Sequence, residues 1–194
     1  MLNKIAAAAL FALIAAPGFA APVDGPGPNV VLEIAGADGA AKGKVVIDLT
    51  DDLAPDHAAR IVDLTKSGAY DGVIFHRVID GFMAQTGDVQ YGKKDGNTAM
   101  AGTGGSDQPD LKAEFSKRSF DRGIVGMARS ADPDSANSQF FIMFAPAPHL
   151  DGQYTVVGHV VEGMDVVDTI AKGDTAANGS VDTPDYIAKA TVAE

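Results

Sequence analysis

An arginine and a glutamine interrupt an otherwise apolar stretch, and they are the first candidates for chemistry. Residues 73–87 read VIFHRVIDGFMAQTG. Alternating β-branched and aromatic residues predict a strand over Val73–Ile79, and the turn dipeptide Asp80-Gly81 predicts a second strand after it. Arg77 and Gln85 can then lie opposite each other, where the glutamine oxygen can accept from a guanidinium that is costly to leave unpaired near a core. The pattern leaves open whether this pair is structural or catalytic.

The other reactive side chains form no recognised motif. No two of the four histidines have helical i, i+4 spacing, and neither His-Glu-x-x-His nor a Gly-x-Ser-x-Gly nucleophile motif occurs. The absence of cysteine excludes a thiolate nucleophile, a disulfide and a cysteine-ligated zinc ion. The GTGG sequence at Gly102–Gly105 lacks the Gly-Lys-Ser/Thr ending of a phosphate-binding loop. We therefore expect no metal and no cofactor, and a small hydrolase would need a nucleophile that we do not find.

The elements that must position these residues are mostly short strands. Tracts of strand-like residues alternate with turn residues, and the long segment Gln90–Pro109 has little periodicity, which is typical of a functional or mobile loop. Many short strands with two helices predict a mainly β fold, an antiparallel barrel whose mouths the helices cover. The other expected strands are Asn29–Ala35, Lys44–Leu49, Gly123–Arg129, Gln139–Ala145, Tyr154–Val161 and Tyr186–Val192, and the expected helices are Pro55–Ser67 and Met164–Ala171.

The N-terminal residues have the pattern of an export signal. Lys4 precedes an apolar run at Ile5–Ala16, and small residues follow, so we interpret residues 1–20 as a cleaved signal peptide. The apolar run is short for a bilayer span, although a retained anchor helix is the alternative. Residues 21–28 (APVDGPGP) predict an extended lead-in, and residues 29–194 predict one domain.

The charge balance limits the partners. The chain has 15 basic and 26 acidic residues, a net charge of −11. Such a surface repels phosphate backbones and acidic lipid headgroups. We expect a secreted, periplasmic protein that is a monomer, has no stable membrane anchor and does not bind nucleic acid.

Several ordered motifs show a resemblance to a known family. The chain resembles the cyclophilin-type peptidyl-prolyl cis-trans isomerases over about residues 29–194. The matching segments are Tyr70–Gly87, Gly102–Gly105, Gly123–Arg129 with Asn137–Ile142, and Leu150–Gly163. The resemblance implies a closed eight-stranded antiparallel barrel capped by two helices, with the active groove on its outer face. Tyr154 stands where many members have histidine and is similar to the bacterial, periplasmic branch.

The resemblance also implies roles for individual residues. Arg77 would be the catalytic arginine and Gln85 the residue that holds it. The pocket for the proline ring would be formed by Phe82, Met83, Phe141 and Leu150. The residues before the proline would bind Gln139, Gly102 and the backbone around Ala128 and Arg129, with His149 and Tyr154 also lining the groove.

The chain departs from the family pattern at four places. His149 replaces a tryptophan that favours cyclosporin binding in many eukaryotic members, so tight binding of cyclosporin is not implied here. Arg129 replaces the usual asparagine, and Thr86 occupies a position that is often glycine. The loop between Asp88 and Gly102 is also longer than in compact members. None of these differences removes Arg77 or its apolar pocket.

The reaction suits these residue types. Rotation about an X-Pro bond crosses roughly 18–20 kcal/mol of amide resonance, and no covalent bond is made or broken. An apolar slot can hold the proline ring while a permanently charged, directional donor stabilises the twisted amide. We therefore predict an isomerase of proline-containing polypeptides that assists the folding of exported proteins. The alternative is a proline-binding or chaperone module without turnover on the same scaffold.

Overall fold

The computed structural model describes residues 24–193, so the predicted signal peptide and the first residues of the lead-in lie outside the described part. Two α-helices and three short 3₁₀ helices accompany eight strands in this part of the chain. The strands are β1 Asn29–Ala35, β2 Ala41–Leu49, β3 Arg77–Ile79, β4 Met83–Thr86, β5 Ile124–Met127, β6 Phe140–Met143, β7 Val156–Glu162 and β8 Tyr186–Ala193. The helices are α1 Pro55–Lys66, α2 Met164–Asp168, η1 Thr98–Met100, η2 Pro148–Leu150 and η3 Thr175–Ala177.

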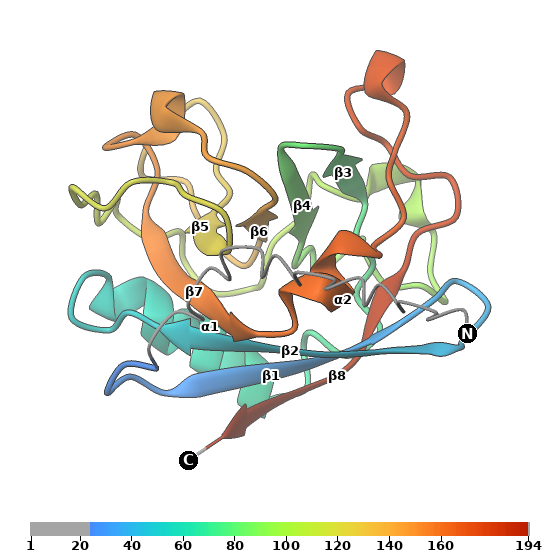
Figure 1. Cartoon of the computed structure of the whole chain (residues 1–194), viewed down its shortest axis with the longest axis horizontal. Coiled ribbons are helices and arrows are strands. Elements are labelled where there is room, and N and C mark those ends of the chain that lie inside the picture. Colours follow the sequence, from blue (N-terminus) through green and yellow to red (C-terminus); the bar gives the residue numbers. More distant parts are fainter. Residues whose placement is uncertain (1–23, 194) are drawn as a thin grey trace, which may run out of the picture.

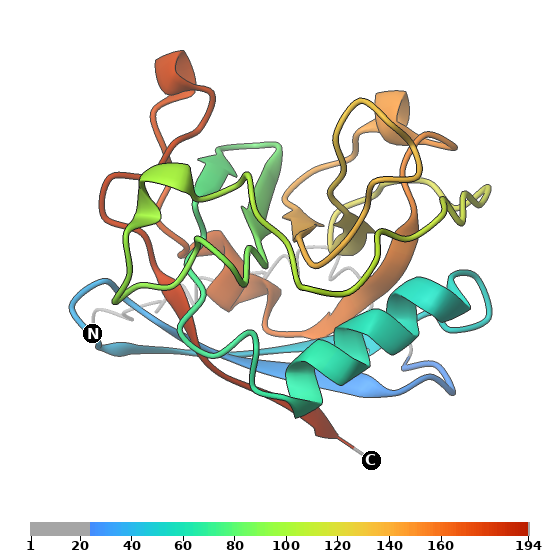
Figure 2. The same ribbon diagram turned by 180° about the vertical axis from the view of Figure 1, so that it is seen from behind.

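The eight strands form one curled antiparallel sheet in the order β3-β4-β6-β5-β7-β2-β1-β8. Figure 1 shows the long strands β1, β2 and β8 side by side, with the short strands β3 and β4 on the opposite side of the molecule. Helix α2 lies in front in Figure 1 and helix α1 lies in front in the reverse view of Figure 2, so the helices cover opposite sides of the curl.

The expected closed barrel is wrong, because the sheet is open between β3 and β8. These two strands are its edges, and within residues 24–193 no ladder joins them. Single bridges link the two regions instead, from Ile74, which precedes β3, to Tyr186 and from Arg77 to Ser180, which precedes β8. The residues before β3 bond alternately to two segments, since the Ile74 N–H donates to the Gly92 carbonyl and the Phe75 N–H donates to the Asp185 carbonyl. This divided pairing also explains why the strand predicted over Val73–Ile79 begins only at Arg77.

Helix α1 follows the local signals of its sequence. Pro55 occupies its first turn, Asp56 is favourably placed near the positive N-terminal end, and Gly68 follows with a φ of 72°. The sequence pattern predicts that His57 lies on the exposed part of this helix, and this prediction is wrong. Its side chain is fully buried, and its Nδ1 lies 2.6 Å from the Glu114 carboxylate.

The main core fills the inside of the curl. Alternate residues of β1, namely Val30, Leu32 and Ile34, are at most 1% exposed and point inward. The apolar residues of α1 and α2 complete this cluster. Along each helix and strand the buried residues have the spacing expected when one face of the element is buried. The contributing helix residues are Ala58, Ile61, Leu64 and Val167, with Ile170 just after α2.

A second apolar cluster lies apart from the main core, on the other face of the β4-β6-β5 region. Its buried members are Met83, Phe120, Ile124, Phe141, Met143, Ala147, Leu150 and Val156. Phe82, Ala128 and Tyr154 pack against it while remaining partly exposed. This cluster gives the outer surface of the sheet an apolar layer on which a groove can form.

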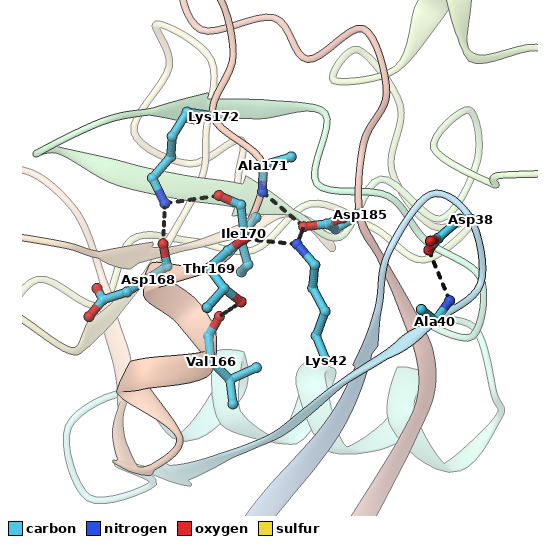
Figure 3. Close-up of polar contacts among 10 residues, drawn as sticks. All are labelled: Asp38, Ala40, Lys42, Val166, Asp168, Thr169, Ile170, Ala171, Lys172 and Asp185. Carbon is cyan, nitrogen blue, oxygen red and sulfur yellow. Dashed lines mark hydrogen bonds and ion pairs between the residues drawn. The ribbon is translucent and has the colours of Figure 1, made fainter.

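The loop from Ala171 to Asp185 is fastened at both ends (Figure 3). The buried Asp185 carboxylate accepts hydrogen bonds from the Ala171 N–H at 2.8 Å and from Lys42 Nζ. Lys172 Nζ donates to the carbonyls of Asp168 at 2.7 Å and Ile170 at 2.9 Å. The end of the loop that follows α2 and the end that leads into β8 therefore lie together, and η3 projects between them.

Candidate active site on the outer face of the sheet

Arg77 and Gln85 lie opposite each other on β3 and β4. The register pairs these two residues, which confirms the placement predicted from the turn at Asp80-Gly81. Arg77 Nη1 donates to Gln85 Oε1 at 3.2 Å and lies 3.9 Å from the Met83 sulfur. The hairpin is short and regular, so the two side chains project to the same face of the sheet.

A chain of side-chain amides extends from this pair. Gln85 Nε2 donates to Gln139 Oε1 at 3.0 Å, and Gln139 Nε2 donates to the Gly104 carbonyl at 2.8 Å. Each amide uses its oxygen toward one neighbour and its nitrogen toward the other, which fixes the orientation of both. The position of the Arg77 guanidinium is thereby linked to the glycine-rich loop.

Asn178 holds the other side of the guanidinium, and the sequence interpretation missed it. Arg77 Nε donates to the Asn178 carbonyl at 3.0 Å, and Nη2 donates to Asn178 Oδ1 at 3.1 Å. Among residues 24–193, Asn178 is the only non-glycine residue with a positive φ, at 56°. The dipeptide Asn178-Gly179 signals a turn with left-handed backbone. No local pattern indicates that this turn reaches an arginine 101 positions earlier in the chain.

An apolar pocket of about 340 Å³ lies beside the guanidinium. Aromatic side chains form much of its wall: Phe82 stacks on His149 with ring centroids 5.8 Å apart, and Phe141 meets Tyr154 edge to face at 5.8 Å. Ten of the twelve predicted site residues line this pocket, namely Arg77, Phe82, Met83, Gln85, Ala128, Arg129, Phe141, His149, Leu150 and Tyr154.

A second pocket of about 250 Å³ adjoins the first and contains the remaining two predicted residues, Gly102 and Gln139. The two pockets share Gln85, Ala128 and Arg129, which we call the ridge. The second pocket is more polar, and the sequence interpretation missed most of its lining. The missed residues are Thr103, Gly104, Ser130, Ser135, Asn137 and Ser138. The structure thus brings all twelve predicted residues into one continuous groove.

The comparison with known protein families shows which family the chain belongs to. The family model described as "Cyclophilin type peptidyl-prolyl cis-trans isomerase/CLD" matches residues 31–192. The chain belongs to this family. It is therefore a cyclophilin-type enzyme, and the reaction of its family is the isomerisation of X-Pro peptide bonds.

Relatives of this cyclophilin-type chain carry the same description. The "Probable peptidyl-prolyl cis-trans isomerase" of Brucella suis is 55% identical over 192 residues, covering 98% of this chain and 95% of the relative. A peptidyl-prolyl cis-trans isomerase of Arabidopsis thaliana, CYP18-1, is 39% identical over 133 residues, covering 69% of this chain and 79% of the relative. The crystal structure of cyclophilin AquaCyp293 from Hirschia baltica aligns with a TM-score of 0.70 at 26% identity, covering 87% of this chain and 74% of that one.

Asp88 organises the loop at the edge of the cyclophilin groove, and the sequence interpretation assigned it no role. Its fully buried carboxylate accepts four backbone hydrogen bonds. Oδ1 accepts from the N–H groups of Gln90 at 3.1 Å and Tyr91 at 2.8 Å, and Oδ2 accepts from those of Gly102 at 2.8 Å and Gly104 at 2.9 Å. The long loop that follows Asp88 is thus drawn back onto its own beginning.

Gly102 allows this loop to approach the hairpin closely. Its φ is 94°, and a Cβ atom at this position would lie 2.9 Å from Cδ2 of His76. His76 lies beneath the groove next to Arg77, and burial lowers its pKa, although attraction to Asp88 offsets part of the effect. The imidazole is therefore favoured in its neutral form.

Arg77 keeps its positive charge in the pocket. Burial lowers the pKa of its guanidinium, and interaction with Tyr154 raises it in part. An arginine stays charged at any working pH, so the guanidinium can act as a donor but not as an acid or base. In residues 24–193, no cluster of three or more potential metal ligands occurs. No helix in the same range has the length and apolarity needed to cross a membrane.

Proposed function

We propose that this isomerase acts on X-Pro bonds of exported polypeptides, with Arg77 as its catalytic residue and Gln85 as the residue that holds it. The observation that carries the proposal is the position of the Arg77 guanidinium at the mouth of an apolar pocket, with Gln85 and Asn178 bound on its two sides. A charged donor fixed next to a pocket of this size suits an X-Pro amide bond, which must twist while the proline ring is held in place.

Hydrogen-bond geometry supports a direct contact between Arg77 and the substrate. The bonds to Gln85 and Asn178 use three of the five N–H groups of the guanidinium. The other two remain for a substrate, one of them making only the weak 3.9 Å contact with the Met83 sulfur. A donor directed at the prolyl nitrogen or at the proline carbonyl favours the twisted amide over the planar one. Preorganisation of this kind contributes on the order of 100-fold to 1,000-fold in rate for a single donor.

The apolar wall has a separate task in this mechanism. Phe82, Met83, Phe141 and Leu150 surround the space in which the proline ring would be buried. Holding the ring fixed makes the carbonyl side of the amide rotate, and burying it removes water that would stabilise the planar, polar ground state. Gln139 and the backbone at Ala128 and Arg129 would bind the residues that precede the proline, as Gly102 would from the neighbouring loop.

The export of the protein is a further part of the proposal. The charged and apolar pattern of residues 1–20 supports a signal peptide, and Tyr154 supports the bacterial, periplasmic branch of the family. In this compartment the enzyme would act as a monomer on polypeptides that are still folding. A membrane anchor and a nucleic-acid partner are not part of the proposal, since the net charge of −11 disfavours both phosphate backbones and acidic lipid headgroups.

A binding module without turnover is the second candidate. The two adjoining pockets, of about 340 and 250 Å³, favour it because together they can hold an extended peptide even without catalysis. The test measures the cis-to-trans exchange of a short X-Pro peptide with the wild type, Arg77→Ala and Arg77→Lys. Arg118→Ala, an exposed arginine outside both pockets, is the matched control.

We expect the wild type and the control to accelerate exchange, and Arg77→Ala to lose 100-fold to 1,000-fold while keeping its melting temperature. Arg77→Lys should recover little, because a lysine does not present a planar, directional donor pair. Peptide binding that survives in Arg77→Ala, together with no acceleration by the wild type, would support the binding module instead.

A further inference from the structure

The groove is basic in an otherwise acidic protein. No aspartate or glutamate lines either pocket, whereas two arginines and one histidine do, namely Arg77, Arg129 and His149. The chain as a whole has 26 acidic against 15 basic residues. The carboxylates are therefore excluded from the surface that the substrate touches.

Arg129 occupies the ridge between the pockets and is held there. Its Nε and Nη2 donate to the Gln153 carbonyl at 3.2 and 2.9 Å, and its Nη1 donates to the Ser130 carbonyl at 2.9 Å. Its Cζ lies 4.4 Å from the centroid of the Tyr154 ring, which is a cation–π contact. The guanidinium is therefore fixed at the place that a peptide must cross to reach both pockets.

The charges of the groove arginines are not neutralised by the protein itself. Five cations away from the groove pair with carboxylates within 4.0 Å: Lys42 with Asp185, Lys44 with Glu33, Lys94 with Asp95, Arg122 with Asp168, and Lys189 with Asp71. In the part of the chain that the structure describes, neither Arg77 nor Arg129 forms such a pair. All of their hydrogen-bond partners are neutral.

The acidic residues that flank the lining segments in the sequence are occupied elsewhere. Asp132 accepts from the Asp134 N–H at 2.9 Å, Asp134 from the Ala113 N–H at 2.8 Å, and Asp151 from the Phe120 N–H at 2.8 Å. These bonds fix the loops around the groove and direct the three carboxylates to backbone N–H groups. The three carboxylates weaken the positive potential in the groove, but none of them forms an ion pair with Arg129.

We propose that the groove prefers X-Pro segments with an aspartate or glutamate at one of the two positions before the proline, and that Arg129 is the specificity-determining residue. The inference rests on the proposed function, in which the residues before the proline cross the ridge. A substrate carboxylate there would supply the counter-charge that the protein does not provide. Arg129 is half-exposed, so the ion pair is screened by water and salt and the preference is modest, about three- to fivefold.

The test uses peptides that differ only by glutamate or glutamine, because these side chains have the same shape. One pair of peptides has the change at the first position before the proline, and a second pair has it at the second position before the proline. A third pair, with the change two positions after the proline, is the positional control. We would measure kcat/KM at low salt and at 0.5 M NaCl for the wild type, Arg129→Gln and Arg129→Lys. Arg118→Gln is the matched control, because it removes the same charge outside both pockets.

We expect the wild type and Arg118→Gln to favour the glutamate peptide about three- to fivefold at one or both positions before the proline, and less in high salt. Arg129→Gln should lose this ratio while still turning over the glutamine peptide, and Arg129→Lys should keep most of it. A wild-type ratio near one at both positions, or an unchanged ratio in Arg129→Gln, would overturn the proposal.

The failure of this proposal can be separated from the failure of the proposed function. Equal acceleration of all peptides would refute the preference but leave the isomerase proposal intact. If no peptide is accelerated, the isomerase proposal fails, and the affinities of the glutamate and glutamine peptides, measured by NMR titration, decide the preference on their own. Tighter binding of the glutamate peptide that depends on Arg129 would still support it, and equal affinities would refute it.

Discussion

Arg77 and Asn178 are joined by two hydrogen bonds, of 3.0 Å from Nε to the asparagine carbonyl and 3.1 Å from Nη2 to its Oδ1. Gln85 binds the same guanidinium through Nη1. The plane of the guanidinium is therefore fixed from two directions, by the neighbouring strand and by the loop after α2. That loop is itself fastened at Asp185 (Figure 3).

Removing the Asn178 side chain should reduce turnover more than substrate affinity. Asn178→Gly tolerates the φ of 56° and keeps the backbone carbonyl, so it removes only the bond to Oδ1. A hydrogen bond to a charged group contributes about 1.5 kcal/mol or more, and we expect a loss of about five- to tenfold in kcat with little change in KM. Asn178→Asp keeps an acceptor and should restore most of the rate. Equal rates for the wild type and the glycine variant would show that Asn178 does not position Arg77.

Filling the space at Gly126 should deform the proline pocket. A Cβ atom there would lie 2.5 Å from Cζ of Phe141 and 2.6 Å from Cε1 of Phe120, and both rings are at least 95% buried. Of the two rings only Phe141 borders the pocket, so it is the one that can give way. Gly126→Ala should displace Phe141 into the pocket, raise KM, and lower the free energy of unfolding by about 1–3 kcal/mol. Peptide titration and urea unfolding would measure the two effects. Gly152→Ala is a useful comparison, because its Cβ meets nothing within 4 Å, although its φ of 67° adds backbone strain. Normal peptide affinity in Gly126→Ala would contradict the assigned pocket.

Asp88→Asn should loosen the loop at the groove edge. An asparagine retains one acceptor oxygen, so two of the four N–H groups now held by Asp88 would face an NH₂ group instead. We expect faster hydrogen exchange at the Gly102 and Gly104 amides, and a loss of about 1–3 kcal/mol in stability. Asp107→Asn, an exposed residue of the same loop, is the control. Unchanged exchange at both glycines would mean that other contacts hold the loop.

His76 should make the stability decrease in mild acid. Burial lowers its folded-state pKa below the ordinary value of 6.5, so the unfolded chain takes up a proton at a higher pH than the folded protein. Its contribution is therefore constant above about pH 6.5 and is lost as the pH falls from 6.5 through the folded-state pKa. Urea unfolding between pH 7.5 and 5 should show a smaller decrease for His76→Gln than for the wild type. Identical slopes for the wild type and His76→Gln would refute this role of His76.

The sequence by itself determined the features that depend on neighbouring residues. Strand alternation placed β1 at its observed residues, and proline and glycine signals placed the start and end of α1 within one residue. The turn at Asp80-Gly81 brought Arg77 opposite Gln85, since a short hairpin leaves little choice of register. The resemblance to the family motifs then indicated twelve residues, and all twelve line the groove, although six further lining residues were missed.

Only the tertiary structure decided which distant segments support these residues. Asn178 reaches Arg77 across 101 positions, Glu114 reaches the buried His57 across 57, and Asp88 binds two glycines of the loop it begins. The opening between β3 and β8 likewise depends on which carbonyls are available to the residues before Arg77. Periodicity records only which face of a strand or helix is buried, because it reflects contacts along one element. A buried polar group must find its partner in three dimensions, and that choice is made when the whole sheet has curled.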